Sequence, residues 1–152
     1  WYAPGHGDVY SSFVRSGYAE KFIGLGKEYV FISNVDNLGA TVDLKILYHL
    51  MCQRATFAME VVKRTRSDKA GGAFIHYDGH PSLLECEQVP SKYRDDFKLL
   101  RNFPLFNTNN IWVHLETWKE RVSAHAIKPT VIPIISRNGS DNAECIAFST
   151  KA

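Results

Sequence analysis

The stretch that decides the fold runs from residue 28 to residue 62 and reads EYVFISNVDNLGATVDLKILYHLMCQRATFAMEVV. It begins with the apolar, β-rich run Glu28–Ser33, which is typical of a strand buried on both faces. Apolar residues then recur at helical spacing from Leu38 to Met51, and a second β-rich run follows at Thr56–Val62. Strand, helix and strand in this order predict a βαβ unit with a parallel pair of strands.

The flanking sequence continues the alternation of helices and strands. Asp78 and Gly79 separate two apolar runs and predict a tight hairpin between Ala73–His76 and Ser82–Cys86. The remaining expected segments are helices at Val9–Phe22 and Ser91–Leu100, a polar loop running into a strand at Phe106–Trp112, a helix carrying Leu115, Trp118 and Val122, and a strand at Val131–Ile135. The pattern indicates an α/β fold.

Composition excludes several classes of protein. The chain has 152 residues, and its hydrophobic fraction of 45% is too high for a disordered protein. A net charge of +2 gives no basis for binding a nucleic acid polymer or an anionic membrane. The apolar runs are shorter than the roughly 20 residues that span a bilayer, and the first residues lack the basic start of a signal peptide, so we expect a soluble, cytoplasmic protein.

The first candidate site is the loop Pro4-Gly5-His6-Gly7-Asp8. Two glycines beside a histidine let the backbone approach a ligand closely and offer amide donors to an anion. An ordinary glycine-rich turn would have the same sequence.

The second candidate, Asn34-Val35-Asp36-Asn37, follows the first predicted strand and precedes the predicted helix. Ligands of open α/β sheets bind at this position, and a carboxylate there can hold Mg²⁺. Capping of the helix by Asp36 or Asn37 is an equally good interpretation, and the two roles are compatible.

A third candidate is the loop with Asn107, Asn109 and Asn110. Asparagine amides with a carboxylate such as Glu85 nearby are suited to hydrogen-bonding the hydroxyls of a sugar. An asparagine cluster is also common in simple turns.

Together the motifs resemble the eukaryotic-type UTP–glucose-1-phosphate uridylyltransferases, also called UDP-glucose pyrophosphorylases. The resemblance is collinear from residue 1 to about residue 135. It is carried by Trp1-Tyr2, Pro4–Tyr10, Gly26–Asp43, Met59–Val61, Thr65-Arg66, Gly71-Gly72, Leu84-Glu85, Gln88–Pro90 and Phe106–Asn110.

The resemblance implies a Rossmann-like nucleotidyltransferase domain with a mixed, mostly parallel sheet, incomplete at both ends, with residues 1–152 as part of the catalytic domain. The implied reaction makes UDP-glucose and pyrophosphate from UTP and glucose 1-phosphate, with Mg²⁺. The sugar phosphate would attack the α-phosphorus of UTP directly, so that catalysis is mainly alignment and charge neutralisation.

The same resemblance assigns roles to individual residues. Asp36 is expected to be the catalytic, metal-binding carboxylate, Gly5 to lie against the nucleotide base, and His6 to act beside the nucleotide phosphate. The expected pocket for glucose and its phosphate comprises Asn34, Gly72, Glu85, Asn107 and Asn109.

The chain departs from the family pattern at both ends. The family's glycine-rich nucleotide loop would precede Trp1. Where the family has a phosphate-contacting lysine, this chain reads Ser136-Arg137-Asn138-Gly139, and Arg137 could replace the lysine as a phosphate contact, although arginine and lysine are not interchangeable there. We therefore expect a fragment of a longer enzyme that is inactive in isolation, and the longer enzyme could be a homo-oligomer. Two alternatives are a non-catalytic relative that binds nucleotide sugars and a pyrophosphorylase for another sugar, such as N-acetylglucosamine 1-phosphate.

Overall fold

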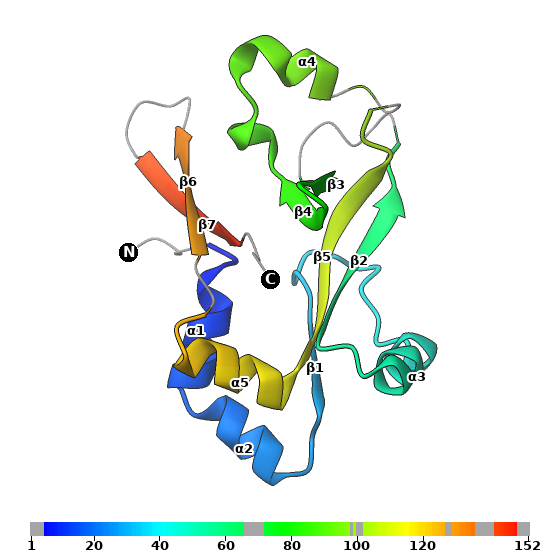
Figure 1. Cartoon of the computed structure of the whole chain (residues 1–152), viewed down its shortest axis with the longest axis vertical. Helices are drawn as coiled ribbons and strands as arrows, with labels where there is room; N and C mark the ends of the chain where they lie inside the picture. Colours follow the sequence, from blue (N-terminus) through cyan, green and yellow to red (C-terminus); the bar gives the residue numbers. More distant parts are fainter. Residues whose placement is uncertain are drawn as a thin grey trace.

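The computed structural model describes residues 5–65, 72–97, 99, 102–126, 129–135 and 142–148, the last two ranges for the backbone. Figure 1 shows upright strands with helices on either side. The helices are α1 (Asp8–Arg15), α2 (Tyr18–Gly24), α3 (Leu44–Gln53), α4 (Arg94–Phe97) and α5 (Leu115–Ser123), with 3₁₀ turns η1 (Cys86–Gln88) and η2 (Ser91–Tyr93). The strands are β1 (Tyr29–Ile32), β2 (Phe57–Lys63), β3 (Ala73–Tyr77), β4 (His80–Leu84), β5 (Leu105–His114), β6 (Pro129–Ile135) and β7 (Asn142–Phe148).

The long strand β5 organises the larger sheet. β1 pairs with one edge of β5, from Tyr29 opposite His114 to Ile32 opposite Ile111, and β3 continues along that edge. β2 pairs with the other edge, and β3 pairs with β4. Strands β6 and β7 form a separate two-stranded sheet, which confirms the strand expected at 131–135.

The mostly parallel sheet expected from the sequence is wrong for the part of the chain that the structure describes. Every strand pair there is antiparallel. β1 and β2 do run in the same direction, as a βαβ unit requires, but β5 lies between them and pairs with both. Hydrophobic pattern predicts strands and their buried faces, but it carries no information about which distant strand is inserted between two others.

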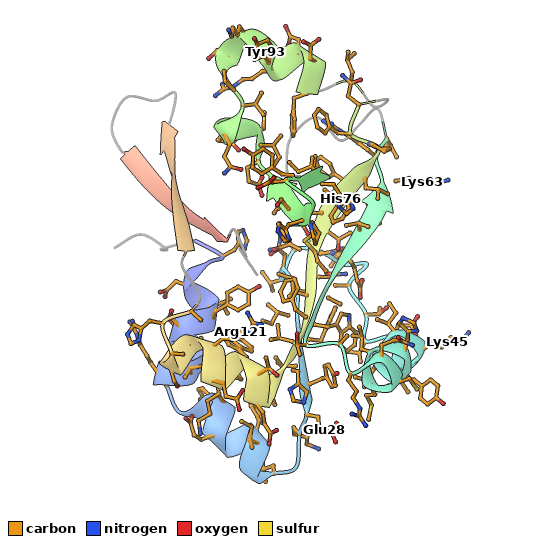
Figure 2. All side chains as sticks on the ribbon, in the orientation of Figure 1. Glu28, Lys45, Lys63, His76, Tyr93 and Arg121 are labelled. Carbon is orange, nitrogen blue, oxygen red and sulfur yellow. The ribbon has the colours of Figure 1, made fainter. Side chains whose placement is uncertain are left out.

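Alternation along the strands separates two faces of the sheet. Val30 and Ile32, together with Ile111 and Val113 of β5, pack against a cluster contributed by α1, α2 and α5. On the other face, Phe31 packs on Trp112, and the Tyr29 hydroxyl donates to the Ala55 carbonyl just beyond α3. In Figure 1, α5 lies beside α1 and α2, and α3 lies on the opposite side of β1, β5 and β2. Figure 2 labels Arg121 of α5 and Lys45 of α3 on these two sides.

Two helices differ from their expected extents. The helix expected at 9–22 is broken at Gly17, whose φ of 77° lies in the left-handed region where glycine is favoured, so that α1 and α2 are separate. The helix expected from Leu38 begins later, at Leu44. Asp43 caps it by accepting a hydrogen bond of 2.7 Å from the Lys45 amide, so the expected cap at Asp36 or Asn37 is wrong.

The hairpin expected at Asp78-Gly79 is confirmed. β3 and β4 pair with Tyr77 opposite His80, and the φ values of 51° at Asp78 and 77° at Gly79 suit a two-residue turn. The helical segment expected at 91–100 consists of η2 followed by the short helix α4.

A buried arginine, Arg64, connects the short helix α4 to the sheet. Arg64, 7% exposed at the end of β2, donates from Nη1 to the Phe97 carbonyl of α4 at 2.8 Å. Its guanidinium also lies over the rings of Phe97 and Phe106. The neighbouring Lys63 projects away from the sheet (Figure 2). Arg64 thus holds the start of β5, immediately before the asparagine-rich segment.

None of the helices in the described ranges is long and apolar enough to cross a membrane.

Candidate functional site

The asparagines expected in a loop lie inside β5, where they form a bulge. Met59 pairs with Ile111 and Val61 with Asn107, so Glu60 of β2 stands opposite three residues of β5, Thr108 to Asn110. Asn109 has a φ of 59°, a left-handed conformation that asparagine tolerates better than most residues. The expectation of a polar loop missed this because β2 pairs with β5 on both sides of the polar segment and keeps it in the sheet.

The bulge brings together three of the candidate segments. The Asn109 amide nitrogen donates to Asn34 Oδ1 at 2.6 Å, just after β1 ends, and lies 3.0 Å from Nδ1 of His6. Because an amide nitrogen is a donor, Nδ1 of His6 must accept, and a neutral ring then carries its proton on Nε2. His6 is exposed, so this N–H is available to an anionic ligand.

A second group joins the same site through Asn107. Its side-chain oxygen accepts from the Asn109 backbone amide at 2.8 Å, and its own backbone amide donates to the Gly72 carbonyl at 2.9 Å. Gly72 lies directly under Glu85, because a Cβ at position 72 would come within 2.6 Å of the Glu85 Oε1 atom. Asn34, Asn109, Asn107, Gly72 and Glu85 are therefore contiguous in the fold.

The carboxyl-bearing residues Glu85 and Asp36 differ in exposure, because Glu85 is half-buried and Asp36 is exposed. Burial, with a smaller contribution from nearby Glu87, raises the pKa of Glu85 above its ordinary value. Asp36 instead lies exposed on the turn after β1. Among the described residues, no hydrogen bond or ion pair engages its carboxylate, so its oxygens are available to a ligand.

Of the two remaining candidate residues, Gly5 and Arg137, the structure describes only Gly5. Gly5 is half-buried with a φ of 94°, a conformation that favours glycine, and its carbonyl accepts from the Asp8 amide at 3.2 Å where α1 begins. Arg137 lies outside the described residues.

The family model of the UTP–glucose-1-phosphate uridylyltransferases matches residues 1–152. The chain belongs to this uridylyltransferase family. It is 50% identical over 133 residues to the UTP–glucose-1-phosphate uridylyltransferase of Pyrus pyrifolia, covering 88% of this chain and 28% of that protein. It is 47% identical over 155 residues to the probable UTP–glucose-1-phosphate uridylyltransferase of Schizosaccharomyces pombe, and the match covers 100% of this chain and 30% of that protein. The chain thus spans less than a third of the length of these uridylyltransferases.

Solved structures of the family have the same fold. A UDP-glucose phosphorylase from Trypanosoma brucei superposes with a TM-score of 0.87 at 34% identity, covering 97% of this chain and 34% of that one. A mutant UDP-glucose pyrophosphorylase from Leishmania major, in complex with UDP-glucose, superposes with a TM-score of 0.75 at 30% identity, and the match covers 99% of this chain and 35% of that one.

The residues that sequence reasoning missed in this uridylyltransferase chain are Glu60 and Trp112. Glu60 accepts hydrogen bonds from Trp112 and from Asn110, and Asn110 in turn accepts from Asn37. A signal was present, because Glu60 is a charged residue within the apolar strand 56–62. Charged groups in such strands require partners.

The candidate site offers a magnesium ion one exposed carboxylate, that of Asp36. Among the described residues, no group of three or more histidine, cysteine, aspartate or glutamate side chains could hold a metal ion. Mg²⁺ in nucleotide sites is commonly bound by one or two carboxylates together with substrate phosphates and water. The exposed, unengaged carboxylate of Asp36 fits that kind of site and does not fit an all-protein metal cage.

Proposed function

We propose that the longer protein containing this chain transfers a uridylyl group from UTP to glucose 1-phosphate, producing UDP-glucose and pyrophosphate. The observation that carries the proposal is the contiguous group of amides and one carboxylate at the β5 bulge, in a chain of the uridylyltransferase family. Such a group can satisfy the hydroxyls of a bound sugar from several directions.

In the proposed reaction, a phosphate oxygen of glucose 1-phosphate attacks the α-phosphorus of UTP. The bond from the α-phosphorus to the oxygen bridging to the β-phosphorus breaks, and pyrophosphate leaves with that electron pair. Asn34, Asn107, Asn109 and Glu85 would hold the sugar, and Gly72 leaves room for the Glu85 carboxylate. Alignment of the two substrates then supplies much of the rate acceleration.

At the nucleotide end, Gly5 would approach the base, and the Nε2–H of His6 would donate to a phosphate oxygen. Asp36 would hold Mg²⁺, which would neutralise charge on the triphosphate. Arg137 stays a prediction as a further phosphate contact.

We also propose that the described unit is part of a larger Rossmann-like catalytic domain. Side chains spaced along α3 are exposed although apolar: Leu44 is 71% exposed, Tyr48 71% and Met51 46%. A stable domain normally covers such a stripe. We expect the 152-residue chain to be inactive in isolation, and turnover by it would contradict this. Cytoplasmic location and homo-oligomerisation of the longer protein also stay predictions.

The test is pyrophosphate release by the full-length protein with UTP, glucose 1-phosphate and Mg²⁺. Asp36→Ala should lower kcat/KM roughly 150-fold, which corresponds to a loss of about 3 kcal/mol of transition-state stabilisation. Asp43→Asn is the matched control, because asparagine at position 43 also caps α3, and it should retain the wild-type rate.

Three outcomes would overturn parts of this proposal. A wild-type rate for Asp36→Ala rejects the metal assignment. Turnover of N-acetylglucosamine 1-phosphate in preference to glucose 1-phosphate rejects the sugar assignment. Binding of UDP-glucose without any turnover identifies a non-catalytic relative.

A further inference from the structure

A carboxylate in the middle of β2 has a precise set of partners. Glu60 Oε1 accepts from the indole Nε1 of Trp112 at 2.7 Å, and Oε2 accepts from Nδ2 of Asn110 at 3.0 Å. The Glu60 carbonyl accepts from the Thr108 hydroxyl at 2.8 Å. Glu60 therefore contacts residues on both sides of Asn109 in the bulge.

The carboxylate also sets the direction of hydrogen bonds beyond its own contacts. Because a carboxylate accepts and does not donate, the amide nitrogen of Asn110 must face Glu60 and its oxygen must face away. That oxygen accepts from Nδ2 of Asn37 at 3.2 Å, which in turn directs Asn37 Oδ1 to the Gly39 amide at 3.2 Å. The chain of bonds ends in the turn that carries Asn34 and Asp36.

We propose that Glu60 is a positioning residue: its carboxylate orients the side chains of Asn110 and Asn37 and thereby holds the 34–39 turn against the β5 bulge. The consequence for function rests on the proposed reaction, because it assigns sugar binding to Asn34 and metal binding to Asp36. Asn110 is 5% exposed, so a reversed amide there could not be compensated by bulk water.

Glu60→Gln tests this with almost no change in shape. Trp112 Nε1 can only donate, so it retains the glutamine oxygen and leaves the glutamine nitrogen facing the Asn110 nitrogen. Relief requires Asn110 to reverse, which places its nitrogen against that of Asn37. The mismatch therefore passes along the chain to the 34–39 turn.

The double variant Glu60→Gln/Asn110→Asp restores every bond. The new carboxylate at position 110 accepts from both the glutamine at position 60 and Asn37, and the total charge equals that of the wild type. Glu120→Gln, an exposed substitution on α5, is the control for loss of one carboxylate.

In the full-length protein, Glu60→Gln should raise the KM for glucose 1-phosphate and the half-saturating Mg²⁺ concentration, each about tenfold, as expected for one buried hydrogen bond lost. The double variant should return both within about twofold of wild type, and Glu120→Gln should match wild type. Unchanged values for Glu60→Gln, or a double variant as impaired as the single one, would overturn the inference.

A second readout does not depend on activity. With asparagine selectively labelled, the side-chain amide resonances of Asn37 should shift in Glu60→Gln and return in the double variant. Resonances that stay unchanged in the single variant would refute the hydrogen-bond chain. If the resonances behave as expected while the wild-type protein shows no uridylyltransferase activity, the proposed function fails and the structural role of Glu60 stands.

Discussion

Gly72 shows how a single hydrogen atom can determine the position of a functional group. A Cβ at this residue would lie 2.6 Å from Glu85 Oε1 and 2.8 Å from Leu83 Cδ1. Both atoms are the far ends of flexible side chains, and Leu83 is only half-buried, so both can move aside.

We therefore predict that Gly72→Ala displaces the Glu85 carboxylate and raises the KM for glucose 1-phosphate by about tenfold or more, while the melting temperature falls by a few degrees at most. Steady-state kinetics and thermal unfolding of the full-length protein measure the two effects. Gly24→Ala is the control, because a Cβ there meets nothing within 4 Å. Equal effects of the two substitutions on KM would contradict the prediction.

The raised pKa of Glu85 predicts a pH dependence of stability. The folded protein disfavours the charged carboxyl. The contribution of Glu85 to stability is therefore most favourable below its ordinary pKa of 4.5 and is lost as pH rises through its higher folded pKa. Glu85→Gln removes this loss. The melting temperature of Glu85→Gln minus that of wild type should increase from pH 4 to pH 7.

The matched control for this pH series is Glu116→Gln, an exposed carboxyl in the first turn of α5. Its difference from wild type should show no comparable increase. A difference for Glu85→Gln that stays flat or falls as pH rises would show that the Glu85 carboxyl is not destabilised in the fold.

At the scale of elements, the turn after β1 and the helix α3 are separate structures. Asp36 and Asn37 belong to a turn in which the Asn37 backbone amide donates to the Asn34 carbonyl at 3.2 Å. The helix begins only at Leu44, with Asp43 as its cap. The separation leaves Asp36 available to a ligand, because another carboxylate caps the helix.

Asp43→Ala should therefore lower stability by about 1 kcal/mol, the usual value for loss of an N-cap, whereas Asp36→Ala should change stability little. Urea unfolding of the full-length protein, monitored by far-ultraviolet circular dichroism, measures both. Asp43→Asn should stay near wild type. A larger loss for Asp36→Ala than for Asp43→Ala would place the cap at the turn after all.

At the scale of the whole molecule, Trp118 connects the helical layer to the loop Gly5-His6-Gly7, the proposed nucleotide contact. It is 2% exposed, stacks on Phe13 with ring centroids 4.8 Å apart, and donates from Nε1 to the Tyr10 carbonyl at 3.1 Å. Both partners lie on α1, the helix that begins directly after Gly5, His6 and Gly7. Burial in this cluster also raises the pKa of Tyr10 to about 12.

Trp118→Ala should cost about 3–5 kcal/mol, as for other large aromatic side chains removed from a core. Trp118→Phe keeps a ring against Phe13 and loses the indole donor, so its cost should be nearer 1 kcal/mol. In the Trp118→Phe variant, the KM for UTP should rise more than that for glucose 1-phosphate, since the loop that carries His6 runs directly into α1. Equal changes in both constants would argue against a specific role of α1 in placing the nucleotide loop.

Much of the candidate site was predictable from residue types and their order. Asn107, Asn109 and Glu85 were chosen for their hydrogen-bonding chemistry, Asn34 was added by the family resemblance, and the fold brings the four residues together. The role of Glu60 was not predicted, because its partners come from β5, about fifty residues further along the chain. The parallel pairing of β1 and β2 was wrong for the same reason, since β5 occupies the position between them.

The amino-acid sequence by itself determined that β1, β2, β3, β4 and β6 of this uridylyltransferase chain are strands, where the Asp78-Gly79 hairpin turns, and which residue types could bind a sugar phosphate. These properties follow from local conformational preference and side-chain chemistry, which are contained in short windows of sequence. The tertiary structure decided that β5 lies between β1 and β2, that its asparagines form a bulge, and that Glu60 directs their hydrogen bonds. Those outcomes depend on contacts between distant segments, whose selection depends on the packing of the whole sheet and not on any one stretch of the chain.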